Sequence, residues 1–594
     1  LIADLSTDSA LQTAANVALL DLDEYAQTVL HNNFSLIQAL QEYEKYGKDP
    51  YRHTKPVVFF LHHQLQQAKQ NGMYLSVDKK SEFQNLQQIA QQLAGKFRSN
   101  IVHDQRYLLA SAEELRGLDV EFLANLTCDH CGNYLVPVNQ KNYDLIMHQC
   151  VHSNTRRDFF MLFKQLGYPS NEPILTEIRA TLNKMAQLLN FDNWAEYQLS
   201  SLNVKSIKKV ESFLHGLMKD VQSAQEQNYA LFTAYAPLNM SLSADQKLYP
   251  WDYDYLKNMY NQKHFALDDS KISEYFVLDR FLPTLLKQLS KFFYITFEEQ
   301  QNSDIWAPGV ICYRVRSLKH QAVLGYLFFD LYQRFAKREV APYELPLVPV
   351  IRDDCSIPCV GATVVVANFK SGDDNTPTLL TFKDVTRLTF QIGQALHSIF
   401  AATRFTQFSG HQVSYDFEHM SGQMLMHWLQ EPTFLQLISS HKNTAHALDR
   451  KTIEKLIARD RFEQNNRLLQ EIFLSVVALR FFQGDDTCEF HHWIEKLYKK
   501  IFRHTHYVPG DFFEMSFAAL SDIDHGAGYY APLWSEVIAA DLFAKIKDYG
   551  ILNHEIGMEY VTDILSPGGA KYPSDMIKKF LGRSANRKAF VSQL

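Results

Sequence analysis

The spacing of apolar residues restricts this chain to a mainly helical fold. Apolar residues recur at three- and four-residue steps along most of the 594 residues, for example at Leu86, Ile89, Leu93 and Phe97, which is the period of an amphipathic helix. Between about residues 305 and 370 the pattern changes to alternation and short apolar runs, which is typical of strands. The sequence therefore predicts a mostly α protein with a small β-sheet inserted at about 305–370.

Composition indicates a globular chain, because 46% of the residues are hydrophobic and 21% are charged. The formal net charge of −7 gives no electrostatic reason to expect a nucleic acid ligand. No apolar run reaches the roughly 18–20 residues that a transmembrane helix needs, so we expect no membrane span. The seven cysteines are sparse and odd in number, which argues for a reducing compartment.

One predicted helix, at 381–403, has the frame of a zinc-peptidase helix with different residues at the chemical positions. In a His-Glu-x-x-His helix, the two histidines bind zinc and the glutamate activates water. Here Phe390 and Gln394 take the histidine positions and Gln391 takes the glutamate position. Phenylalanine has no donor atom, and an amide is a poor zinc ligand and cannot serve as a general base. The helix therefore predicts an emptied site.

Further segments carry a resemblance to a known family. They are Pro-Trp-Asp-Tyr at 250–253, Gly-Tyr-Leu-Phe-Phe-Asp-Leu-Tyr-Gln-Arg at 325–334, Glu-Leu-Pro at 344–346 and Gln-Ala-Leu-His-Ser at 394–398. With them the chain resembles the thimet oligopeptidase and mitochondrial intermediate peptidase family of zinc metallopeptidases, from about residue 250 to the C-terminus and more loosely before it.

The resemblance implies a two-lobed helical ellipsoid around a deep channel. It would divide the chain into an N-terminal helical lobe at 1–205 and a metallopeptidase-like lobe at 206–594. The degenerate zinc-site helices would lie at 381–403 and 416–430. The family motif His-Glu-x-Gly-His-Ala-x-His-Ser, aligned on Gly393, places the first ligand at Phe390, the base at Gln391 and the second ligand at Gln394.

The family's third ligand is a glutamate in an Asp-Phe-x-Glu context. Here Asp-Phe-Glu-His at 416–419 puts His419 at that position, with Glu418 one residue early. We interpret His397 and His419 as ordinary hydrogen-bonded or surface histidines. The alternative is a rebuilt metal site from His397, Glu418 and His419, although adjacent helical residues point about 100° apart.

The family's C-terminal substrate-binding segment also has altered residues here. Its form is His-x-x-Gly-Tyr-x-Ala-x-Tyr-Tyr-x-Tyr-Leu, and the chain has Ser-Asp-Ile-Asp-His-Gly-Ala-Gly-Tyr-Tyr-Ala-Pro-Leu at 521–533. By the resemblance, the family's His and Tyr side chains bind substrate and the developing oxyanion. The substituted positions include Ser521, His525 and Pro532, whereas Tyr529 and Tyr530 remain as candidate peptide-binding residues or as ordinary packing residues.

A separate group of cysteines and histidines lies between residues 98 and 155. Cys128 and Cys131 form a Cys-x-x-Cys pair, and His148 and Cys150 follow; thiolate and imidazole groups of this kind can bind zinc. The spacing differs from that of a standard zinc finger, and buried free thiols are the alternative. We interpret 134–138 and 144–148 as a short hairpin.

Together these features predict a catalytically inactive, mitochondrial intermediate peptidase-like protein of the mitochondrial matrix. It would be a structural or peptide-binding subunit of a larger mitochondrial assembly, with protein partners and an extended peptide as a further candidate ligand. We expect no cofactor, because the zinc site is lost. The alternative is an active zinc oligopeptidase, a metalloendopeptidase with unusual ligands that processes mitochondrial peptides.

Overall fold

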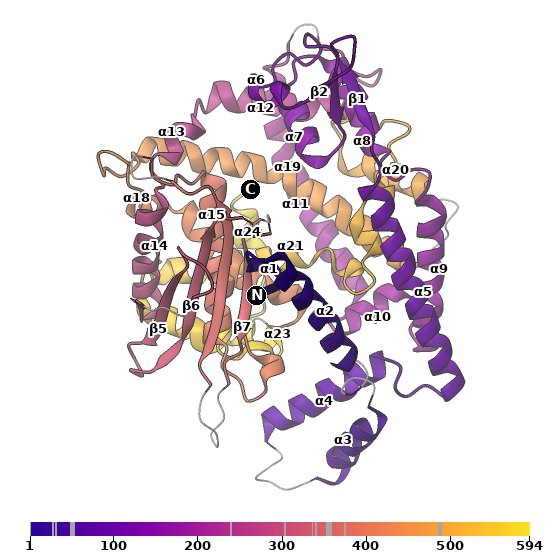
Figure 1. The fold of residues 1–594 in the computed structure, drawn as a ribbon, viewed down its shortest axis with the longest axis vertical. Helices are drawn as coiled ribbons and strands as arrows, with labels where there is room; N and C mark the ends of the chain where they lie inside the picture. The colour runs from indigo at the N-terminus through magenta and orange to yellow at the C-terminus, as the bar shows by residue number, and fades with distance from the viewer. Residues whose placement is uncertain are drawn as a thin grey trace. The chain divides into compact units, whose positions relative to one another are not determined.

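A computed structural model describes the chain from residue 2 to residue 594, apart from residues 27–28, 30–32, 48–53, 238–239, 302–304, 336, 339–340, 352–358, 373–375, 411 and 485–489. Cys355 and Cys488 therefore lie outside the described residues. Most of the described chain is helical (Figure 1), which confirms the predicted fold class. Among the described residues, no helix combines the length and the apolar content that crossing a bilayer requires.

Contacts divide the chain into two compact units whose segments interleave. The first unit comprises Leu1–Tyr74, Asp268–Ile457 and Ala531–Gln593, and the second comprises Leu75–Leu267 and Ala458–Tyr530. These ranges differ from the division at residue 205 that the resemblance suggested. That division, and the channel between two lobes, remain predictions.

The first unit takes its helices from both ends of the chain and from its middle. They are α1 (Ile2–Leu5), α2 (Ser9–Tyr25), α3 (Phe34–Tyr46), α4 (Lys55–Gln70), α13 (Asp269–Ser273), α14 (Leu278–Phe293), α15 (Phe382–Phe400), α16 (Tyr415–Glu418), α17 (Met420–Met426), the 3-10 turn η3 (His427–Gln430), α18 (Pro432–Ile438), α21 (Ala531–Tyr549), α22 (His554–Tyr560), α23 (Pro573–Leu581) and α24 (Lys588–Val591). Helix α19 (Arg450–Gln483) begins in this unit and ends in the other.

A five-stranded sheet completes the first unit, in the order β4-β5-β6-β8-β7. The strands are β4 (Ile295–Glu299), β5 (Ile311–Ser317), β6 (Val323–Tyr332), β7 (Tyr343–Val348) and β8 (Gly361–Phe369). β6 and β8 are parallel, and the other neighbours are antiparallel. The small sheet expected at about 305–370 is therefore confirmed, and it begins slightly earlier, at Ile295.

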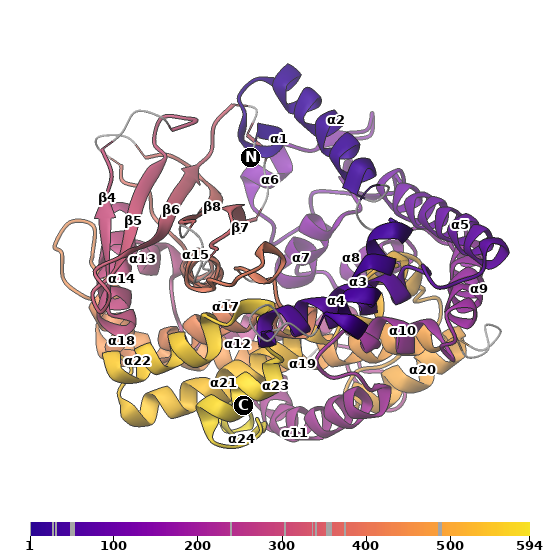
Figure 2. The same cartoon turned by 90° about the horizontal axis from the view of Figure 1, so that it is seen from below.

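Helix α15 packs against this sheet, in contact with β6, β7 and β8 (Figure 2). In β8, residues 364–367 are all fully buried, as expected for a strand covered on both faces. Gly325 in β6 permits the close approach, because a Cβ there would lie 3.1 Å from the Ile399 side chain. The sheet thus fixes one side of α15.

Helix α17 fixes another side of α15 through two glycines. A Cβ added at Gly393 would lie 2.6 Å from the Ser421 carbonyl oxygen and 2.8 Å from the Gly422 Cα. A Cβ added at Gly422 would lie 2.6 Å from the ring of Phe390. Both glycines are therefore needed because the two helices approach too closely for side chains at these positions.

The second unit is also mainly helical. Its helices are α5 (Val77–Val102), α6 (Val120–Ala124), α7 (Gln140–Gln149), α8 (Ser153–Lys164), α9 (Glu172–Leu188), α10 (Trp194–Ser200), α11 (Ile207–Thr233), α12 (Pro250–His264) and α20 (Phe490–Ile501). A three-stranded sheet in the order β1-β3-β2 joins them, formed by β1 (Tyr107–Ala110), β2 (Thr127–Cys128) and β3 (Tyr134–Pro137).

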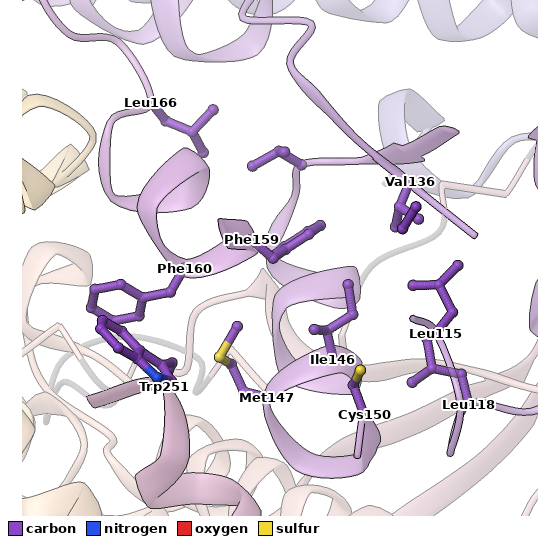
Figure 3. Packing of buried hydrophobic residues seen from close by; sticks show 12 residues of the cluster. Leu115, Leu118, Val136, Ile146, Met147, Cys150, Phe159, Phe160, Leu166 and Trp251 are labelled. Carbon is purple, nitrogen blue, oxygen red and sulfur yellow. The ribbon is translucent and has the colours of Figure 1, made fainter. Parts of the chain in front are cut away.

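A buried apolar cluster, which includes Val136, Ile146, Phe159 and Trp251, joins this small sheet to α7, α8 and α12 (Figure 3). The hairpin expected at 134–138 and 144–148 is wrong in its second half, which lies in helix α7. The side-chain oxygen of Asn139 accepts a hydrogen bond from the Asn142 amide and caps this helix. The N-cap therefore favours a helix over a second strand.

Directly after α17, His427 is buried and stacks on Phe543 of α21 with ring centroids 5.4 Å apart. Burial lowers the pKa of His427 from 6.5 to about 4. The folded chain therefore holds this imidazole neutral at pH values where the unfolded chain would protonate it.

The close contact at Gly393 predicts that adding one methyl group there destabilises the fold. Gly393→Ala should lower the free energy of unfolding by about 1–3 kcal/mol, because the neighbouring atoms are backbone and must move. The matched control is Gly95→Ala in α5, where a Cβ meets nothing within 4 Å; it should raise stability by about 0.5–1 kcal/mol. Urea denaturation measures both, and equal effects of the two substitutions would contradict this packing.

The buried imidazole predicts a pH dependence of stability. Because the folded pKa of His427 is lower than the unfolded one, its neutral form favours folding above pH 6.5, and this contribution is lost as pH falls toward 4. The loss should approach about 3 kcal/mol. His427→Phe should flatten the stability profile between these pH values, whereas His130→Phe, at an exposed position, should leave it unchanged. An unchanged profile in His427→Phe would refute the assignment.

Candidate functional site

The candidate site centres on helix α15, whose start is fixed by a capping box. The Thr381 hydroxyl oxygen accepts a hydrogen bond from the Asp384 amide at 3.1 Å, and the Asp384 carboxylate accepts one from the Thr381 amide at 3.0 Å. From Ile392 to Phe400 every residue of α15 is buried. The capping box and the burial thus fix the position of α15, which carries residues 390, 391 and 394.

Phe390 occupies the first ligand position and is half-buried. Its ring lies against Gly422, and its centroid is 6.0 Å from the centroid of the His419 ring. His419 also contacts the ring of Tyr415, with centroids 6.3 Å apart. Phe390 thus has a packing role between α15 and the start of α17, and it offers no atom that could bind a metal.

The two glutamines bind neighbouring protein groups. The Gln394 side-chain oxygen accepts hydrogen bonds from the Ser421 hydroxyl at 2.5 Å and from the Gly422 amide at 3.2 Å. The Gln391 side-chain nitrogen donates to the Pro342 carbonyl at 3.0 Å. Both side chains are therefore structural links, from α15 to α17 and from α15 to the segment before β7.

Glu344 of β7 is a carboxylate that is hydrogen-bonded to α15. It accepts hydrogen bonds from the hydroxyl of Ser398, at 2.9 Å, and from the hydroxyl of Thr363. Neither Glu344 nor Ser421 was predicted as a partner of this helix. Glu344 lies in a segment that carried the family resemblance, whereas nothing in the sequence around Ser421 indicated its role.

Neither alternative metal site is brought together. His397 is fully buried in α15, while Glu418 and His419 are half-buried at the end of α16. In the part of the chain that the structure describes, no three His, Cys, Asp or Glu side chains are grouped so that they could hold a metal ion. A rebuilt site from His397, Glu418 and His419 is therefore not assembled in this structure.

The cysteine group is likewise dispersed. Cys128 and Cys131 are exposed, whereas Cys150 is buried and its thiol donates to the Glu114 carbonyl at 3.2 Å. The His148 ring nitrogen Nδ1 lies 2.6 Å from the Asp144 carbonyl oxygen in its own helix. In this structure the three cysteines are free thiols, and of the three only Cys150 is buried.

The C-terminal segment belongs to the second unit up to Tyr530. Ser521 is buried and donates to the Ala518 carbonyl at 2.8 Å, and His525 is exposed. Tyr530 is fully buried, whereas Tyr529 is half-buried and packs edge-on against Phe517, with centroids 5.0 Å apart. Of the two tyrosines, only Tyr529 has part of its surface exposed.

Pro532 lies in the first turn of α21, in the first unit. Proline is well tolerated there because the first amides of a helix lack partners within the helix. The family's tyrosine hydroxyl at this position is thus replaced by a side chain without a donor. Pro532 therefore suits the start of a helix, and its side chain cannot bind a substrate by a hydrogen bond.

Comparison with known proteins places this site in a family. The family model for peptidase family M3 matches residues 146–594. Oligopeptidase A of Escherichia coli (strain K12) is 24% identical over 546 residues, which cover 89% of this chain and 79% of that protein. Thimet-like oligopeptidase of Dictyostelium discoideum is 24% identical over 100% of this chain and 90% of its own.

A mitochondrial intermediate peptidase of Arabidopsis thaliana is 22% identical over 96% of this chain and 82% of its own length. Among solved structures, a peptidase from Chlamydophila abortus is similar with a TM-score of 0.61 at 12% identity, covering 99% of this chain and 84% of that one. PZ peptidase A is similar with a TM-score of 0.54 at 10% identity. These structural likenesses concern the fold alone.

The family match corrects one expectation. We expected no cofactor, but the matched family consists of zinc metallopeptidases, and the match points to zinc as the cofactor. The side chains of Phe390, Gln391 and Gln394 do not fit the family's way of holding and using that metal, because they supply neither imidazole nor carboxylate. The family model nevertheless matches most of the chain, residues 146–594, and the chain therefore belongs to peptidase family M3.

Proposed function

We propose that this chain is a catalytically inactive, mitochondrial intermediate peptidase-like member of family M3. In this proposal it acts as a structural or peptide-binding subunit of a larger mitochondrial assembly in the matrix. The observation that carries the proposal is the chemistry at position 391. The amide of Gln391 has no useful pKa for taking a proton from water, and its nitrogen donates to the Pro342 carbonyl.

The surroundings of Gln391 support the same conclusion. Hydrolysis of a peptide bond requires a group that accepts a proton from the attacking water. The Glu344 carboxylate already accepts hydrogen bonds from the Ser398 and Thr363 hydroxyls at its Oε1 atom, so it has a structural role between β7, β8 and α15. Gln391 itself supplies no such base.

Peptide binding does not need that base. Tyr529 retains a hydroxyl on a partly exposed ring held against Phe517, and a tyrosine hydroxyl is a group that can donate a hydrogen bond to a peptide carbonyl. Tyr530 would support it from within the core. An extended peptide held in this way would remain intact.

The mitochondrial location proposed here rests on relatives. The relatives include a mitochondrial intermediate peptidase and a chloroplastic/mitochondrial organellar oligopeptidase A of Arabidopsis thaliana. A chain that keeps its fold while its chemical positions are filled by packing residues is suited to a role based on shape. Protein partners in the matrix would use that shape.

The second candidate function is an active zinc oligopeptidase with unusual ligands that processes mitochondrial peptides. Family membership favours it, since the named relatives are peptidases. In that case a base other than Gln391 would have to activate water. The two candidate functions differ in whether the chain cleaves a peptide, which a peptidase assay measures.

The proposal predicts binding without cleavage. The purified chain, assayed with zinc added, should leave a quenched fluorescent octapeptide intact, because position 391 supplies no base. Mass spectrometry of the recovered peptide checks this result, and oligopeptidase A serves as the active control. Cleavage that a chelator abolishes would refute catalytic inactivity and favour the second candidate.

Tyr529→Phe should weaken binding of the same octapeptide by about three- to tenfold, since one hydrogen bond is lost while the ring contact with Phe517 is kept. Tyr549→Phe, at an exposed position of α21, is the matched control and should bind like the unmodified chain. Fluorescence anisotropy measures both affinities. Equal affinities would remove Tyr529 from the peptide-binding site.

A further inference from the structure

The outer edge of β4 is a second feature of the first unit that the proposed function does not use. β4 is at one end of the sheet and β7, which contacts α15, is at the other. Figure 2 shows β4 at the outer edge of the sheet. Any ligand of β4 would therefore be separated from the α15 site by the intervening strands.

The pairing of β4 with β5 leaves backbone groups on this edge. The Leu318 amide donates to the Tyr294 carbonyl at 3.1 Å, and the Gln300 amide donates to the Cys312 carbonyl at 2.8 Å. In an antiparallel pair, successive residues point their backbone N–H and C=O groups alternately toward and away from the partner strand. The backbone groups of the even-numbered residues of β4 therefore point toward β5, and those of residues 295, 297 and 299 point away from it, to the open edge. Between described residues, no backbone hydrogen bond uses these outward groups.

A groove lies beside this edge, between α14, β4 and the start of α22. Its volume is about 830 Å³, and its apolar lining includes Pro283, Phe297, Tyr313 and Leu552. Tyr294, also in the lining, is 37% exposed, so aromatic surface is available to a ligand. The groove can receive the side chains of a strand added to β4.

The charges of the groove indicate the kind of partner. Lys287 and Lys291, one turn apart on α14, line it and are exposed. Lys291 donates to the Gln288 side-chain oxygen at 3.1 Å, and neither lysine forms an ion pair within the described residues. Glu299 is exposed at the far end of β4. Acidic side chains beside the lysines would complete the charge pattern.

We propose that the free edge of β4 binds an extended acidic segment of a partner protein as an additional β-strand. Its backbone would pair with the outward amides and carbonyls of β4. Alternate side chains would enter the groove, with carboxylates beside Lys287 and Lys291. Strand addition of this kind obtains affinity from backbone pairing and specificity from alternate side chains.

The probe is a fluorescent acetyl-Asp-Val-Asp-Val-Asp-Val peptide amide, compared with the same peptide carrying Lys in place of Asp. The unmodified chain should bind the acidic peptide more tightly by about tenfold or more, since two lysines face it. The double variant Lys287→Glu/Lys291→Glu should reverse this preference. Absence of binding to the acidic peptide, or equal binding of both peptides, would overturn the proposal.

A backbone substitution tests the strand pairing separately. Glu299→Pro removes an outward amide without breaking the ladder to β5, a position where edge strands tolerate proline. It should weaken binding of the acidic peptide by about five- to tenfold relative to Glu299→Ala, which keeps the amide. Thermal unfolding of both variants verifies that they are folded. Equal affinities of the two variants would overturn the proposal.

A second copy of the chain is the competing occupant of this edge. Analytical ultracentrifugation should give the same oligomeric state for the unmodified chain and for Glu299→Pro. A dimer that dissociates in Glu299→Pro, but not in Glu299→Ala, would assign the edge to a second copy and overturn the proposal. These results are independent of peptide cleavage, so they do not depend on the function proposed for α15.

Discussion

The contact between α15 and α17 is the constraint on which the candidate site depends. Gly393 and Gly422 allow the two helices to approach so closely that a Cβ on either would collide with the other helix. This approach brings the Ser421 hydroxyl within 2.5 Å of the Gln394 side-chain oxygen and sets the Phe390 ring on Gly422. The contact thus places Phe390 and Gln394 against partners on α17.

Family membership points to zinc, whereas the side chains of Phe390, Gln391 and Gln394 supply no imidazole or carboxylate. The interactions that maintain the fold explain how the two observations are compatible. The fold is maintained by glycines, by the capping box of Thr381 and by burial of α15 against the sheet. None of these interactions involves a metal ligand or a general base. The ligand positions can therefore change without loss of the fold, while the family match still points to zinc.

Periodicity was sufficient to predict the helices and the sheet, because amphipathic patterns are local. It predicted α15 within a few residues and the strands near 305–370. It misassigned the 144–148 segment, where the Asn139 cap selects a helix. The bond between Gln394 and Ser421 could not be predicted, since the partners are 27 residues apart and depend on how two helices pack. The dispersal of Cys128, Cys131 and Cys150 likewise depends on tertiary structure.

The central claim is that Gln394 and Phe390 are packing residues committed to α17. The most direct test is a crystal structure of the chain grown with a zinc salt, with anomalous data collected at the zinc absorption edge. The account predicts that the Gln394 oxygen stays within hydrogen-bonding distance of the Ser421 hydroxyl and the Gly422 amide. A Gln394 side chain turned away from Ser421 toward an anomalous peak beside α15 would contradict it.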